Sequence, residues 1–134
     1  MKRALPMMLL VVAACARGPS GHETRTTDVS GTPAPGVVDG KAAAALAASG
    51  ARVVDVRTPQ EYAAGHVPGA VNIPFDDIAR RAGELGEPDV PVVLYCRSGR
   101  RSAIAGDALR RLGFEKVYDA QRYDRWPLGG AGGR

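Results

Sequence analysis

Short apolar runs alternate with segments of helical periodicity along most of this chain. Residues 92–95 are apolar or aromatic throughout, and residues 52–56 include three valines, which predicts two buried strands. Shorter strands are predicted within residues 67–74 and at 117–118, and helices at 42–48, 75–85 and 101–112. Strands that alternate with helices in this way favour a single α/β domain, with a mostly parallel sheet and helices on both faces.

Residues that begin or end helices mark several boundaries. Asp39 can cap the alanine-rich helix at 42–48, and Gly50 would end it. Thr58 and Glu61 have the spacing of a capping box, with a proline at the first helical position, so a short helix is expected there. Gly113 follows the helix at 101–112 and would stop it.

Several polar residues follow the strand at 52–56. Asp55 lies near the carboxyl end of that strand, where ligands bind in parallel sheets, so it is a candidate for the rim of a pocket. The alternative is a strand-end aspartate that caps a turn. Arg57 and Glu61 are four residues apart and are placed to form an ion pair, and His66 is interpreted as a hydrogen-bonded turn residue rather than as a general base.

The two ends of the chain lack the pattern of a folded domain. Lys2 and Arg3 precede an apolar stretch at 5–12 that is too short for a stable membrane anchor, so residues 1–14 are interpreted as a signal peptide. The cleavage region ends in Cys15 and resembles a bacterial lipobox, in which that cysteine carries the lipid; an ordinary secretory signal is the alternative. The remaining predictions are a flexible tether at 15–36, the domain at 37–128 and a disordered tail at 129–134.

These interpretations place the protein at the cell envelope, held to a membrane by its N-terminal lipid on the extracytoplasmic side. The formal net charge of +4 includes Lys2 and Arg3, and removal of those two cations leaves +2. The sequence has no long basic stripe with interleaved aromatic residues, so it gives no support for nucleic-acid binding. We expect a monomer that acts on small molecules.

One loop concentrates the residues that can carry chemistry. Cys96 comes directly after the strand at 92–95, and it is followed by Arg97, Ser98, Gly99, Arg100, Arg101 and Ser102. A tight loop here can direct several backbone N–H groups inward, and the positive end of the next helix adds to their field. Such surroundings lower the pKa of a thiol from its usual ~8.5 to ~3.5–7.5. We therefore interpret Cys96 as a nucleophile rather than as a buried cysteine that only fills space.

Several motifs together resemble the single-domain rhodanese family of sulfurtransferases. They are the loop from Cys96 to Ser102, the run Val54-Asp55-Val56-Arg57, the pair Glu61-Tyr62 and the run from Gly65 to Pro74, and the match extends over about residues 37–126. Family members close the loop as Cys-x-x-x-x-Arg, whereas the related phosphatases and arsenate reductases have one more residue in the ring. Here Arg101 closes the shorter ring, and position 102 is serine.

The resemblance implies a two-step sulfur transfer. The loop would hold one terminal sulfur on Cys96 as a persulfide, surrounded by the N–H groups of residues 97–102, and the arginines would stabilise a small anionic sulfur donor such as thiosulfate. The thiophilic acceptor would be cyanide, sulfite or a thiol, and no metal or organic cofactor is needed. The alternative is a rhodanese-fold module at the cell envelope that binds a partner or senses sulfide without catalysis.

The chain departs from the family near its C-terminus. Where relatives carry a Gly-Gly pair a few residues before a tryptophan, this chain has Gln121 and Arg122 before Trp126. This departure changes the turn beside the loop from Cys96 to Ser102 (the active loop), and with it the rim of the pocket and the acceptor preference. The side chain of Arg122 is expected to be solvated.

Overall fold

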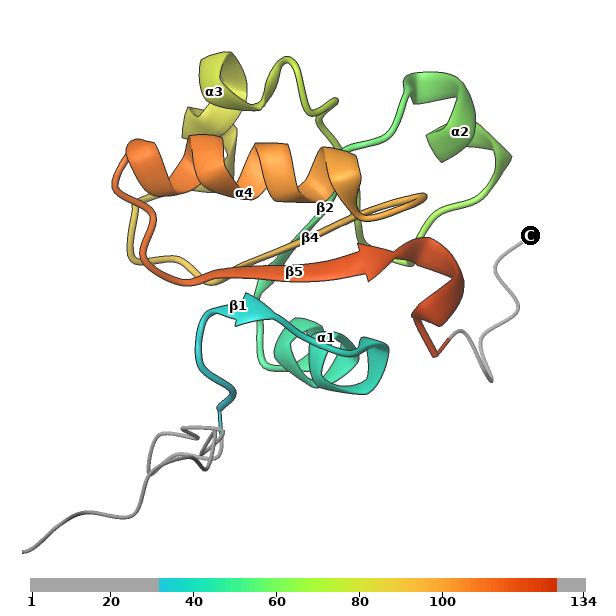
Figure 1. Cartoon of the computed structure of the whole chain (residues 1–134), viewed down its shortest axis with the longest axis horizontal. Helices are drawn as coiled ribbons and strands as arrows, with labels where there is room; N and C mark the ends of the chain where they lie inside the picture. The colour runs from blue at the N-terminus through green and yellow to red at the C-terminus, as the bar shows by residue number, and fades with distance from the viewer. Residues whose placement is uncertain (1–31, 128–134) are drawn as a thin grey trace, which may run out of the picture.

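The computed structural model describes residues 32–127, which form a single parallel sheet with helices on both faces (Figure 1). The strands have the order β1-β5-β4-β2-β3. They are β1 (Gly36–Val37), β2 (Arg52–Asp55), β3 (Val71–Asn72), β4 (Val92–Cys96) and β5 (Val117–Arg122). The predicted α/β fold class is confirmed. The predicted signal peptide, Cys15, most of the tether and the tail at 129–134 lie outside the described residues.

The helices divide between the two faces of the sheet. Figure 1 shows α1 (Gly40–Ala48) on one face and α4 (Arg100–Arg111) with α3 (Ile78–Arg81) on the other. The short helix α2 (Pro59–Ala64) follows β2. Two 3₁₀ turns complete the fold, η1 (Ala82–Leu85) after α3 and η2 (Tyr123–Arg125) after β5. Among residues 32–127, no helix is long and apolar enough to cross a bilayer.

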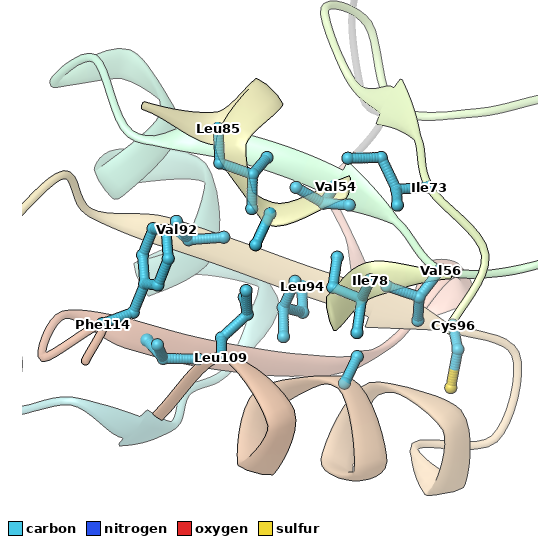
Figure 2. Close-up of a cluster of buried hydrophobic side chains, with 13 residues drawn as sticks. Val54, Val56, Ile73, Ile78, Leu85, Val92, Leu94, Cys96, Leu109 and Phe114 are labelled. Atoms are coloured by element: carbon cyan, nitrogen blue, oxygen red, sulfur yellow. The ribbon is translucent and has the colours of Figure 1, made fainter. Parts of the chain in front are cut away.

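Each face of the sheet has its own buried core, and all of β4 lies between the two. Alternate side chains of a strand point to opposite faces, so β4 contributes Leu94 to one core and Tyr95 to the other. Figure 2 shows the core beneath α3 and α4, with Cys96 at one end of the cluster. Strand β4 is therefore packed on both faces, and this packing fixes the position of Cys96, its last residue.

Several local predictions are confirmed. The carboxylate of Asp39 accepts a hydrogen bond from the N–H of Ala42 at 2.8 Å and caps α1. Thr58 and Glu61 form the capping box at the start of α2. Gly50 and Gly113 have φ values of +100° and +96°, a left-handed conformation that favours glycine and ends the preceding helices.

Three elements differ from the sequence-based expectations. The helix predicted at 75–85 is one α-helical turn, α3, followed by the 3₁₀ turn η1, because α3 has no side-chain cap and Gly83 interrupts the run. The last strand was predicted as 117–118, but β5 continues to Arg122. Strand β1 was not predicted, since Gly36 and Val37 are too short for a periodic signal and acquire strand geometry only by pairing with β5.

Candidate functional site

The loop after β4 surrounds the sulfur of Cys96 with hydrogen-bond donors. The chain turns sharply at Gly99, which has φ +95° and precedes the first turn of α4. This turn brings the N–H of Gly99 to 2.9 Å from Sγ of Cys96. The hydroxyl of Ser102, in the first turn of α4, lies 3.6 Å from the same sulfur. The glycine at this position lets the backbone bend around the thiol without steric cost.

These donors offset the cost of burying the thiol. Burial raises the pKa of Cys96, but the hydroxyl of Ser102 and the N–H groups of Ser102, Gly99 and Ser98 stabilise the thiolate and together bring the pKa below the ordinary thiol value. The dominant stabilising groups are thus hydrogen-bond donors of the loop itself. This is the arrangement expected of an activated nucleophile.

A bulge in β5 brings a further backbone group to the sulfur. The register between β4 and β5 shifts, so that Leu94 pairs with Asp119 and Cys96 pairs with Arg122. Gln121 lies in this irregular stretch and has a left-handed φ of +62°, and its carbonyl oxygen lies 3.4 Å from Sγ of Cys96. The carboxylate of Asp119 accepts the Gln121 N–H at 2.8 Å and supports this backbone. The departure from the family at position 121 is therefore in direct contact with the sulfur of Cys96.

A pocket of about 650 Å³ opens beside the loop. Its walls come from α2 and the residue before its cap, the active loop, the end of β5 and η2. They comprise Arg57, Glu61, Ala64, Arg97, Ser98, Arg122, Tyr123 and Asp124. Cys96 lies behind this wall and exposes none of its surface. Arg97 is the lining cation without an ion pair among the described residues, so it leaves a positive charge next to the thiol.

Asp55 does not form the rim of this pocket. Its side chain is fully buried and pairs with Arg57, whose Nη2 lies 2.6 Å from Oδ2 of Asp55. The hydroxyl of Tyr95 donates to the same carboxylate at 3.0 Å. The guanidinium of Arg57 also stacks on the ring of Tyr123, 4.6 Å from its centroid. Asp55 therefore has the turn-supporting role that was the alternative for it. Arg57 belongs to the pocket wall, and its position there is fixed by its pairing with the buried Asp55.

The predicted Arg57–Glu61 ion pair is also not present. Arg57 pairs with Asp55, and Glu61 accepts two hydrogen bonds from Arg101, at 2.8 Å and 3.0 Å. The buried carboxylate of Asp55 is the nearer partner for Arg57, which leaves Glu61 for the loop. His66 has the predicted turn role, since its Nδ1 lies 2.9 Å from the carbonyl oxygen of Tyr62 and its ring stacks on that residue.

The remaining loop arginines differ in their surroundings. Arg100 is exposed and does not line the pocket, whereas Arg97 does. Arg122 lines the pocket too and pairs with Asp124, with Nε 2.9 Å from Oδ1, so it is not simply solvated as expected. Sequence reasoning did not find Tyr123 or Asp124, because their roles depend on the turn after β5. Within residues 32–127, no group of three His, Cys, Asp or Glu side chains is arranged to hold a metal ion.

Comparisons with known proteins agree with this geometry. The family model for the rhodanese-like domain matches residues 39–121. The putative sulfur carrier protein YrkF of Bacillus subtilis is 43% identical over 65 residues, which are 48% of this chain and 35% of YrkF. The thiosulfate sulfurtransferase PspE of Escherichia coli is 37% identical over 68 residues, which are 50% of this chain and 65% of PspE. The chain thus spans about a third to two thirds of these curated relatives.

A solved structure has the same fold. The human single-domain sulfurtransferase TSTD1 superposes with a TM-score of 0.57 at 28% identity, covering 68% of this chain and 93% of TSTD1. The family match covers residues 39–121, which include β4, Cys96 with its loop, and α4. With its parallel sheet, its cysteine loop and a matching family model over most of its described residues, the chain belongs to the rhodanese-like domain family.

Proposed function

We propose that this protein is a thiosulfate-type sulfurtransferase that carries sulfur as a persulfide on Cys96. The observation that supports this most is the set of loop groups at Sγ: the Gly99 N–H donates to the sulfur at 2.9 Å, and the Ser102 hydroxyl lies 3.6 Å from it. These groups stabilise a thiolate, and after transfer they can stabilise a terminal sulfur in the same place. The names of the relatives and the family of the domain agree with sulfur transfer.

The reaction proceeds in two displacements at sulfur. The thiolate of Cys96 attacks the sulfane sulfur of thiosulfate, a new S–S bond forms, and the old S–S bond breaks with its electron pair leaving on sulfite. A nucleophilic acceptor, which is cyanide, sulfite or a thiol, then attacks the outer sulfur. The bond to Sγ breaks, its electron pair returns to Cys96, and the thiolate is regenerated without a redox cofactor.

Access to Cys96 requires a local movement, because the residue exposes none of its surface. The carbonyl of Gln121 and the N–H of Gly99 are in contact with the sulfur. Arg97 lines the adjacent pocket and attracts the anionic donor to this position. A small shift of the loop or of the Gln121 backbone then admits the sulfane sulfur.

The proposal includes a location for the protein. Lipidation of Cys15 would hold the domain at the extracytoplasmic side of a membrane, and residues 15–36 would act as the tether. Cys15 would then be blocked as a thioether, and Cys96 would remain as the free thiol of the mature chain.

Mass spectrometry of the purified Cys15→Ser protein tests the chemistry, because Cys96 is then the sole thiol. Thiosulfate should add the mass of one sulfur atom, and cyanide should remove it with release of thiocyanate. The Cys96→Ser, Cys15→Ser double variant should show neither change. Absence of a sulfur adduct on the folded protein would reject the persulfide mechanism and favour a non-catalytic binding module.

A further inference from the structure

An ion pair joins α2 to the active loop. Nη1 and Nη2 of Arg101 donate to the two carboxylate oxygens of Glu61 at 2.8 Å and 3.0 Å. The two side chains are about three-quarters buried, with exposed fractions of 23% and 25%. Two parallel hydrogen bonds fix the orientation of a guanidinium as well as its position. Arg101, which closes the loop at the start of α4, is therefore anchored to a residue 40 positions earlier in the chain.

Glu61 serves the helix cap and the loop at once. Its Oε2 accepts the Thr58 N–H at 3.0 Å in the capping box, and the same oxygen accepts from Arg101. Hydrogen bonding to Arg101 lowers the pKa of Glu61 to about 2, so the carboxylate is ionised at every pH at which the thiol titrates. The start of α2 thus holds a permanent negative charge against the active loop.

Arg101 is close enough to Cys96 to affect it. The hydrogen bonds that Arg101 donates to Glu61 raise the pKa of Arg101 most, and the charge on the Cys96 thiolate raises it further. The other charged groups of the pocket wall form pairs of their own, Arg57 with Asp55 and Arg122 with Asp124. Of the three arginines in the active loop, Arg97 and Arg100 have no ion pair with a described residue. Of these two, Arg97 lines the pocket and Arg100 does not.

We propose that Glu61 is a positioning residue for the reactive thiol: it fixes Arg101 and cancels most of its charge, so that the Ser102 hydroxyl and the loop N–H groups set the state of Cys96. Arg97 is then the cation that meets the incoming anion. The role of Arg97 toward the anion rests on the proposed sulfur transfer. The role of Glu61 toward the thiol does not rest on it, because it applies to any reaction of Cys96.

The pH dependence of Cys96 alkylation by iodoacetamide tests this role, with every variant made in the full chain carrying Cys15→Ser. Glu61→Gln leaves the charge of Arg101 uncompensated, so the midpoint of the labelling profile should fall by roughly 0.3–1 pH unit. Arg101→Gln leaves the carboxylate uncompensated, so the midpoint should rise by a similar amount. The double variant should return close to the reference protein.

A merely structural role predicts a different pattern. Loss of loop order would remove the donors around Sγ, so both single variants and the double variant would shift upward toward an ordinary thiol. Shifts in the same direction, or no shift in Glu61→Gln, would overturn the proposal. If Glu61→Gln alone does not fold, the step from Arg101→Gln to the double variant still removes the Glu61 charge, and it must lower the midpoint.

Two control variants separate charge from stability. Glu84→Gln removes a carboxylate that pairs with Arg81 through two hydrogen bonds of 2.8 Å and 2.9 Å, the same type of pair. Figure 2 shows Leu85, next to Glu84, at the opposite end of the core from Cys96, so this change should leave the midpoint unchanged. Asp39→Ala removes the side-chain cap of α1, on the opposite face of the sheet from α4 (Figure 1), and should lower the melting temperature without moving the midpoint.

Thiosulfate kinetics complete the test. Glu61→Gln should lower the KM for thiosulfate about twofold or more at low salt, because an uncompensated Arg101 adds positive charge near the pocket, and the effect should fade as salt rises. An unchanged KM would show that Glu61 does not shield the anion from Arg101, and it would overturn the statement that Arg97 meets the anion because Arg101 is neutralised. If the reference protein shows no sulfur transfer, the proposed function fails, while the labelling profiles still decide the role of Glu61.

Discussion

The hydroxyl of Ser102 has two partners, and its orientation follows the charge of Cys96. Its oxygen lies 3.0 Å from the carbonyl oxygen of Gly99 and 3.6 Å from Sγ of Cys96. With a neutral thiol, the hydroxyl donates to Gly99 and accepts from the S–H group. When Cys96 is a thiolate, the Ser102 hydroxyl instead donates its proton to the charged sulfur, which is the stronger acceptor. The buried residue is thus never left unsatisfied in either state.

Ser102→Ala should raise the pKa of Cys96 by about half a unit to one unit, because it removes the leading group that opposes the effect of burial. Labelling of Cys96 at neutral pH should slow, and the midpoint of its pH profile should move up. Ser98→Ala is the matched control, since the exposed Ser98 contributes its N–H and not its hydroxyl. Equal profiles for Ser102→Ala and the unaltered protein would assign the activation to the backbone alone.

Arg97 and Arg100 provide a second comparison within one loop. Arg97→Ala should raise the KM for thiosulfate about three- to tenfold with little change in kcat, because a pocket-lining cation holds the anion similarly in the ground and transition states. Arg100→Ala should have a smaller effect, since Arg100 does not line the pocket. Steady-state kinetics at low and high salt measure both variants. A larger effect from Arg100 would contradict this assignment.

The turn of the loop around Cys96 could be predicted from the sequence, and the ion pair between Arg101 and Glu61 could not. Cys96 and its loop are contiguous in the chain, so their spacing already describes a turn around a sulfur. The pairing of Arg101 with Glu61 joins residues 40 positions apart, and the local spacing instead favoured Arg57 as the partner of Glu61. That alternative fails because Asp55, fully buried, requires the guanidinium of Arg57 to neutralise it.

The turn η2 shows how one element supports the site from outside the loop. Its Tyr123 lines the pocket and stacks on Arg57, while its other end packs against the start of α1. A Cβ placed on Gly40 would lie 1.9 Å from the backbone oxygen of Arg125, so only glycine allows α1 and η2 to approach this closely. The position of the pocket wall therefore depends on a residue in the first helix.

Gly40→Ala should lower the free energy of unfolding by roughly 1–3 kcal/mol, because the backbone of η2 must move to accept the methyl group. Denaturant unfolding measures the loss, and the KM for thiosulfate should change as the Tyr123 wall shifts. Gly83→Ala is the control, since a Cβ there meets nothing within 4 Å. A stability loss as large in Gly83→Ala would show that the effect is not steric.

Elements with their own local signals were predicted well, and elements defined by tertiary pairing were not. The caps at Asp39 and Thr58 and the apolar run of β4 are properties of adjacent residues, and each is present as expected. Strand β1 and the end of β5 exist because each pairs with a neighbour. The bulge at Gln121 belongs to the second group: the departure at positions 121 and 122 indicated an altered turn, but not a bulge with a left-handed glutamine.

At the scale of the whole molecule, the active loop lies at the carboxyl end of β4, the central strand of the sheet, which is flanked by β5 and β2. Parallel strands direct their following loops to the same edge of a sheet, so α2, the cysteine loop and η2 converge on one pocket. The chain enters the fold at β1, which pairs with β5 at the border of the sheet. An attachment at the N-terminus therefore joins the fold at an edge strand, and Val37 of that strand is exposed.

Cys15→Ser tests the proposed anchor in the full chain expressed in a bacterium. If Cys15 is lipidated, the unaltered protein should sediment with membranes and dissolve only in detergent, because two or more acyl chains bury enough CH₂ groups for stable attachment. Cys15→Ser should be released or remain as unprocessed precursor of higher mass. Cys96→Ser is the matched control, since it removes the other cysteine and should leave the membrane fraction unchanged. Recovery of the unaltered protein in the soluble fraction with a free Cys15 thiol would reject lipidation and favour an ordinary secretory signal.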